Sequence, residues 1–196
     1  IADAALAEGD QELANKAARE IVAVFPETDT ALYARTILAK SAIENENYED
    51  AIVHLDVIRE VFASSPQAAE ALLMLGDIYI KRMQYDKADQ CYTEVLGVKE
   101  WKKKWPQALY GRGEVARKQR DYAKAAAYFE RIYILYRYYD EWVAKAYLAR
   151  AECLQKMREY AKAVEVLEEM LANDELKNGP YGAEAAEMIE DVRKRI

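Results

Sequence analysis

The sequence contains few of the residues that make tight turns, with seven glycines and four prolines among 196 residues. In an average globular protein these two residues together make up roughly 12% of the chain, about twice the share found here. Sandwiches and barrels of β-strands need many tight turns. The scarcity of glycine and proline therefore argues against these folds and favours an all-α protein.

Residues that carry out chemistry are also scarce, since the chain has one histidine, His54, and two cysteines, Cys91 and Cys153. These three residues cannot complete a four-ligand zinc site without carboxylates, and two cysteines are too few for a disulfide framework. No glycine-rich loop precedes a helix to hold phosphate. We therefore predict no catalytic residue, no metal and no cofactor, and we interpret the protein as a non-enzyme.

Long apolar runs are absent, and no segment approaches the roughly 18 residues needed to cross a bilayer. The chain has 35 acidic and 28 basic side chains, and its net charge of −7 disfavours sequence-independent binding to nucleic acid. The hydrophobic content of 52% indicates a folded core. We expect no membrane insertion and no nucleic-acid partner, and the composition identifies no compartment.

An internal repeat is the main feature that the sequence does have. A tyrosine recurs every 37 or 38 residues, and each one is followed three residues later by an alanine. The tyrosines are Tyr48, Tyr85, Tyr122 and Tyr160, the alanines are Ala51, Ala88, Ala125 and Ala163, and Ala14 extends the alanine series backwards. A self-match at such a period indicates a solenoid of stacked repeats.

Each repeat is predicted to contain two helices. Apolar residues recur at helical spacing from Leu32 to Glu44, the pattern breaks at 45–47, and a second helix runs from Tyr48 to about Phe62. The same pattern predicts helices at 69–81 and 85–96, 106–118 and 122–136, and 144–156 and 160–171, with a helix from Gln11 and another at 183–196. We expect one solenoid over 1–196, made of a partial repeat 1–29, repeats 30–66, 67–104, 105–141 and 142–179, and a closing helix 180–196.

Small residues late in the first helices, Gly76 and Gly113 with Ala39 and Ala151, join the recurring alanines in a pattern that resembles the tetratricopeptide repeat (TPR) family. The resemblance covers essentially the whole chain, although the units run 37 to 39 residues instead of about 34. It implies a right-handed α-solenoid, or superhelix, of antiparallel helix pairs. The long units are similar to those of bacterial cell-envelope TPR proteins, which suggests the periplasm or cell envelope as a location.

The family resemblance also implies a non-catalytic scaffold that binds a peptide or protein segment in a concave groove lined by the first helices. Projecting the family's inward positions onto this chain gives the candidate groove residues Tyr33, Lys40, Glu70, Asp77, Lys81, Tyr110, Glu114, Lys118, Lys145, Glu152 and Lys156. Two alternatives stay open: self-association into a homo-oligomer through terminal helices, and a regulatory TPR domain within a larger envelope protein.

Two charged rows are expected along this groove. The acidic row is Asp77, Glu114, Glu152 and Asp191, and the basic row, one helical turn away, is Lys81, Lys118 and Lys156. The rows can select a ligand, or each acid can pair with the lysine four residues later and stabilise its own helix by about 0.2 to 0.5 kcal/mol. We favour the second interpretation, and the two are compatible.

Two boundary segments are further candidates. Residues 99–105 combine lysines with two tryptophans, as in proteins that stack single-stranded bases or lie on membranes, but we favour a loop with packed tryptophans and solvated lysines. The next boundary contains the aromatic residues Tyr133, Tyr136, Tyr138, Tyr139 and Trp142. Most of these are expected in the core, which leaves Tyr138 or Tyr139 for an exposed partner contact.

Overall fold

The computed structural model describes residues 10–196, and over these residues the chain is helical and contains no strand. It divides into two compact units, residues 1–78 and 79–196, with the division inside one helix. The predicted end of a first helix within residues 1–9 lies outside the described residues.

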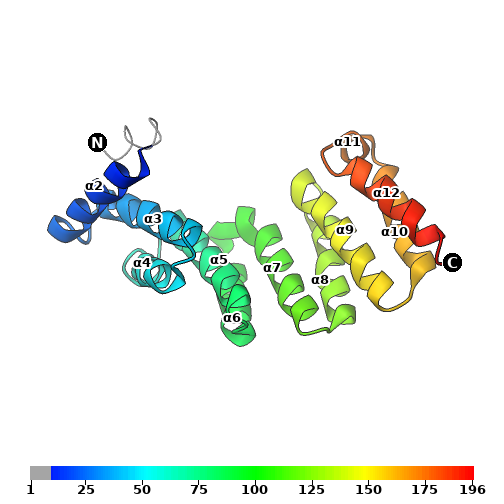
Figure 1. The fold of residues 1–196 in the computed structure, drawn as a ribbon, viewed down its shortest axis with the longest axis horizontal. Helices are drawn as coiled ribbons and strands as arrows, with labels where there is room; N and C mark the ends of the chain where they lie inside the picture. The colour runs from blue at the N-terminus through cyan, green and yellow to red at the C-terminus, as the bar shows by residue number, and fades with distance from the viewer. Residues whose placement is uncertain (1–9) are drawn as a thin grey trace. The chain divides into compact units, whose positions relative to one another are not determined.

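In its described residues, 10–78, the first unit contains three complete helices and most of a fourth. These are α2 (Gln11–Val24), α3 (Asp29–Glu44), α4 (Tyr48–Val61) and α5 (Pro66–Lys81), the last up to residue 78. In Figure 1, α2 packs against α3 and α3 against α4. Apolar residues of α2 and α3, including Ala18, Ile37 and Leu38, form a core between these two helices.

The second unit contains the end of α5 and the remaining helices. These are α6 (Tyr85–Gly97), the 3₁₀ helix η1 (Lys99–Lys104), α7 (Trp105–Lys118), α8 (Tyr122–Leu135), α9 (Asp140–Lys156), α10 (Tyr160–Leu171), α11 (Asp174–Lys177) and α12 (Gly182–Arg193). From α6 to α10 each long helix packs against the next one, and α12 packs against α10 (Figure 1). A shared core runs through α7 to α12.

Small residues lie where the paired helices approach each other. The recurring alanines Ala14, Ala51, Ala88, Ala125 and Ala163 are all completely buried. A Cβ atom added at Gly113 would lie 2.4 Å from Cε1 of Phe129, which is closer than real side chains tolerate. A larger side chain would therefore overpack this contact, at a cost of about 1 to 3 kcal/mol. The small residues at Gly113 and at the recurring alanines therefore suit these close helix contacts.

The boundaries between repeats contain two short helices that were not predicted, η1 and α11. The expected loop at 99–105 is mostly 3₁₀ helix, in which Trp101 is 9% exposed. The indole Nε1 of Trp105 donates hydrogen bonds to the backbone oxygens of Val95 (3.1 Å) and Val98 (3.2 Å). Both tryptophans thus pack within the second unit, as the interpretation of this segment as a connection predicted.

One predicted helix start is wrong by four residues. The pattern predicted a helix from Ala144, but α9 begins at Asp140. Asp140 and Glu141 place negative charge in the first turn, where it interacts favourably with the helix dipole. The charged residues Asp140 and Glu141 add nothing to an apolar periodicity, so this pattern could not mark the start of the helix.

Candidate functional site

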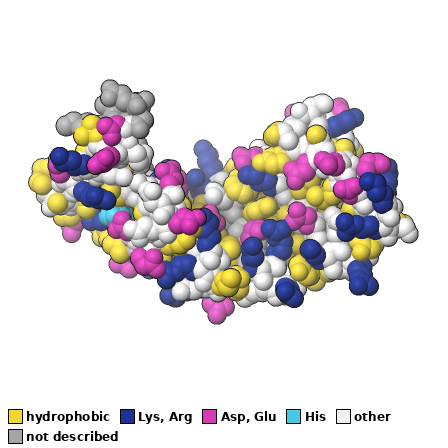
Figure 2. Space-filling view, viewed as in Figure 1, with side chains coloured by type: hydrophobic (Ala, Val, Ile, Leu, Met, Phe, Trp, Pro, Cys, Tyr) yellow, Lys and Arg dark blue, Asp and Glu magenta, His cyan; other side chains and the backbone are white. Residues whose placement is uncertain are grey.

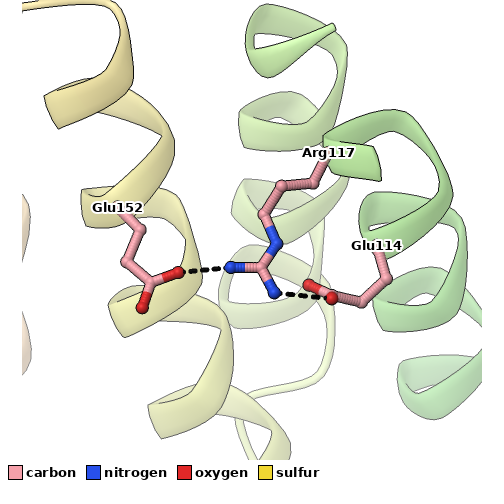
Figure 3. Close-up of polar contacts among 3 residues, drawn as sticks. All are labelled: Glu114, Arg117 and Glu152. Carbon is pink, nitrogen blue, oxygen red and sulfur yellow. Dashed lines mark hydrogen bonds and ion pairs between the residues drawn. The ribbon is translucent and has the colours of Figure 1, made fainter. Parts of the chain in front are cut away.

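Arg117 links two carboxylates from successive first helices of the second unit. Its Nη2 atom lies 2.7 Å from Oε2 of Glu114 on the same helix, α7, and its Nη1 atom lies 2.5 Å from Oε2 of Glu152 on α9 (Figure 3). Hydrogen bonds between charged groups are about twice as strong as those between neutral groups. The guanidinium therefore fixes the orientation of both carboxylates and joins α7 to α9.

The electrostatics of this group favour a charged Arg117. Burial alone would lower the pKa of Arg117, but the hydrogen bond and charge of Glu114 and the charge of Glu152 raise it. The other oxygen of Glu114, Oε1, is buried and has no hydrogen-bond partner among the described residues. Two carboxylates share one guanidinium, so the group keeps one negative charge.

A cleft of about 560 Å³ lies between α9 and α12, next to Glu152. We call it the acidic cleft, and it is lined by Glu152, Gln155, Lys156, Glu184, Glu187, Met188, Asp191 and Arg195. Four of these side chains are carboxylates and two are cations. Oδ1 of Asp191 lies 2.9 Å from Nζ of Lys194, whereas Glu184 and Glu187 form no ion pair within the described residues.

Aromatic residues lie between α7 and the start of α9. The ring of Tyr110 on α7 lies 5.1 Å from the ring of Phe129 and 5.6 Å from that of Trp142, measured between centroids. The ammonium of Lys145 lies 4.7 Å from the Trp142 centroid and 2.5 Å from Oε1 of Glu141. Lys145 is thus held in place by a cation–π contact and an ion pair.

Tyr110 is a half-buried polar residue beside Glu114. Burial, followed by the negative charge of Glu114, raises the pKa of Tyr110 to about 12. The hydroxyl therefore stays protonated at neutral pH. Figure 2 shows acidic, basic and hydrophobic side chains interspersed over the second unit on the side in view.

The structure brings together two of the predicted groove residues in the first unit. Nζ of Lys40 on α3 lies 3.4 Å from Oε1 of Glu70 on α5, so an ion pair links two successive first helices. Tyr33, also on α3, is 51% exposed. Asp77 and Lys81 are exposed on α5.

The prediction of ion pairs within single helices of the second unit is wrong. Glu114 and Glu152 both bind Arg117, while Lys118 and Lys156 are exposed and form no ion pair with a described residue. The planar guanidinium of Arg117 can bind both carboxylates at once, so it competes well for them with the flexible lysines. The expected acidic row does form locally, because Glu152 lies near Glu114 and lines the same cleft as Asp191.

The residues with reactive side chains are buried or partly buried, and Cys153 lies close to the charges of Arg117, Glu152 and Glu114. Burial raises the pKa of Cys153 to about 12, and both cysteines are free thiols within the core. His54 Nε2 lies 3.8 Å from Oδ1 of Asp50, and burial lowers its pKa. In residues 10–196 no three His, Cys, Asp or Glu side chains are grouped as metal ligands would be.

Within residues 10–196, no helix is both long and apolar enough to cross a membrane.

Family models described as tetratricopeptide repeats match residues 38–97, 81–140 and 145–174. The chain belongs to the tetratricopeptide repeat family. Overlapping matches of one model alone cover residues 38–140, more than half of the sequence. No curated protein matches the chain at a significant level. As a TPR protein, the chain is a protein–protein interaction scaffold.

Solved structures give the same fold. MamA is 18% identical, with 99% of this chain and 97% of that one covered at a TM-score of 0.70. The pilF protein of Pseudomonas aeruginosa is 19% identical, and the alignment covers 99% of this chain and 86% of that one at a TM-score of 0.64. A signal transduction ATPase with a tetratricopeptide repeat sensor from Pyrococcus horikoshii is 20% identical. Here the alignment covers 99% of this chain and 32% of that one, and the TM-score is 0.75. The predicted all-α, TPR-like solenoid is confirmed.

Proposed function

We propose that this TPR scaffold binds a segment of a partner protein along the first helices α7, α9 and α12, with a lysine or arginine of the partner in the acidic cleft. The observation that carries the proposal is the excess of carboxylates around this cleft. A cationic partner side chain would gain charge-assisted hydrogen bonds there.

One wall of the acidic cleft is organised before a partner arrives. Arg117 holds Glu152 on one wall, while Glu184 and Glu187 stand on α12 at the other wall. Met188 supplies an apolar contact for the methylene stem of a lysine or arginine. Glu152, which Arg117 already holds in place, loses little conformational entropy on binding and so adds to affinity.

The neighbouring aromatic residues would hold the rest of the partner segment. Tyr110 and Trp142 contact each other between α7 and α9, and Lys145 lies over the Trp142 ring. Buried or half-buried aromatic residues are frequent anchors of protein interfaces. We also propose that the scaffold acts without catalysis, because Cys153 stays a protonated thiol and His54 is half-buried beside a carboxylate.

The test compares two double charge reversals that change the net charge equally. Glu184→Lys with Glu187→Lys alters the acidic cleft, whereas Glu94→Lys with Glu165→Lys alters exposed positions on the second helices α6 and α10. Each protein is immobilised, and the captured partners are identified by mass spectrometry. Partners should be lost with the first variant and retained with the second.

A direct measurement uses a fluorescent peptide of alternating lysine and alanine and follows its anisotropy. We expect binding to wild type and to the control variant, with an affinity that falls as salt screens the charges. Equal affinity for all three proteins would contradict the assignment of the acidic cleft. Partners retained by the cleft variant would contradict the proposed binding face as a whole.

A further inference from the structure

The connection between α8 and α9 exposes a concentration of large apolar side chains. Tyr138 is 97% exposed, and the last two residues of α8, Ile134 and Leu135, are 50% and 58% exposed. This edge adjoins the N-terminal end of α9 (Figure 1), whereas the α9 residues that line the acidic cleft lie at the C-terminal end of the helix. The proposed function therefore does not use these side chains.

A second cleft, of about 450 Å³, lies directly beside this connection. We call it the tyrosine cleft, and it is lined by Tyr133, Ile134, Arg137, Asp140, Val143, Tyr147, Glu169, Ala172, Asn173 and Leu176. Its deeper walls are apolar, because Tyr133, Val143, Tyr147 and Leu176 are buried members of the core. An exposed aromatic residue and an apolar recess thus occur side by side on one edge.

The deeper wall of the tyrosine cleft is rigid. The rings of Tyr133 and Tyr147 are stacked with centroids 3.9 Å apart and an interplanar angle of 10°. The Tyr147 hydroxyl donates to Oε1 of Glu169 at 3.1 Å, and Arg150 donates to the Tyr133 hydroxyl. A recess whose aromatic walls are fixed in this way can receive another aromatic ring at little entropic cost.

Charges of both signs flank the recess. Arg137 immediately precedes Tyr138, and Asp140 follows two residues later, and both line the tyrosine cleft. The side chain of neither residue forms a hydrogen bond or ion pair elsewhere in the described part of the chain. When a surface meets its own copy across a two-fold axis, each residue faces a different residue of the same patch. An arginine and an aspartate on one patch can then pair twice.

We propose that two copies of this chain associate through this edge, with Tyr138 of each copy inserted into the tyrosine cleft of the other. The patch contains the protruding ring, the recess and both members of the ion pair, so it is complementary to itself. A partner of a single charge sign would leave either Arg137 or Asp140 unpaired. The patch is small, so the contact belongs to the weak end of protein interfaces.

The test is sedimentation equilibrium of the full chain from low micromolar to near-millimolar concentration. Wild type should form a dimer as concentration rises, and Tyr138→Ala should raise the dissociation constant at least about tenfold, as expected for a central aromatic anchor. Phe25→Ala removes another exposed aromatic side chain, from the first unit, and should leave the dissociation constant unchanged.

Charge exchange tests the two-fold arrangement itself. Arg137→Glu should weaken the dimer, and adding Asp140→Arg to it should restore association, because the ion pairs form again with the signs exchanged. All changed residues are exposed, and circular dichroism will show that each variant keeps its helices. A wild-type monomer at every concentration, or a dimer that Tyr138→Ala leaves intact, would overturn the proposal.

Discussion

The turns inside the helix pairs share one backbone geometry, whereas the connections between pairs differ from one another in length and structure. The turns occupy residues 45–47, 82–84, 119–121 and 157–159. The connections after them occupy 62–65, 98–104, 136–139 and 172–181, and two of them contain the short helices η1 and α11. The turns show the structure that each repeat requires, and the connections show features that are specific to this chain.

Each turn inside a pair closes with the same hydrogen bonds. The middle residue has a positive φ, between 55° and 63°, and is Glu46, Met83, Arg120 or Arg158. The next residue donates its N–H to a carbonyl five residues back, in the pairs Asn47 to Ala42, Gln84 to Tyr79, Asp121 to Ala116, and Glu159 to Leu154, at 2.8 or 2.9 Å. This is a Schellman motif, which is set by the backbone and accepts varied side chains.

The connections are held by side chains instead. Trp101 and Trp105 anchor the connection that contains η1, and Asn173 caps α11 by accepting from the N–H groups of Glu175 and Leu176. The connection at 136–139 presents Tyr138 to solvent. The regular turns therefore specify the helix pair, and the irregular connections supply surfaces specific to this chain.

The largest expected effect comes from removing a side chain that anchors a connection. Trp101→Ala should lower the free energy of unfolding by about 3 kcal/mol, because the indole is almost fully buried. Urea unfolding followed by circular dichroism measures the change. Lys103→Ala, in the same segment but exposed, should change the stability by less than about 0.5 kcal/mol. Equal losses in the two variants would contradict the statement that a buried side chain holds this connection.

A smaller effect, of opposite sign, is expected in a turn inside a pair. Met83 adopts a positive φ and its side chain is 76% exposed, so its Cβ adds strain with little compensating burial. Met83→Gly should raise the free energy of unfolding by about 0.5 to 1 kcal/mol, the relieved strain less the entropy of the freer unfolded chain. Met83→Ala keeps the Cβ and should show no such gain, so an equal gain from alanine would refute the strain argument.

The repeat was predictable from the sequence because its signal lies in side chains that the packing requires. The alanines near each helix contact and the tyrosine at each second helix repeat with the structure itself. The positive φ values left no signal, since none of the four residues is glycine. Similarly, the charged rows predicted an ion pair between Glu114 and Lys118. Sequence spacing does not show that Arg117 binds Glu114 and reaches across to Glu152.

The smallest effect concerns the last residue of each regular turn, whose side chain caps the second helix in some turns and not in others. Asn47 and Asp121 accept from the backbone N–H three residues on, at Asp50 and Lys124, whereas Glu159 makes no such bond. Glu159→Asp shortens the side chain and should create the missing cap to Lys162, a gain of about 0.5 kcal/mol.

The matching loss provides the control for this gain. Asn47→Ala removes an existing cap and should lower the free energy of unfolding by about 1 kcal/mol. Thermal and urea unfolding of both variants measure the two changes. If Asn47→Ala is neutral, the Schellman backbone alone starts each second helix, and the turns are even more independent of side chains than their hydrogen bonds indicate.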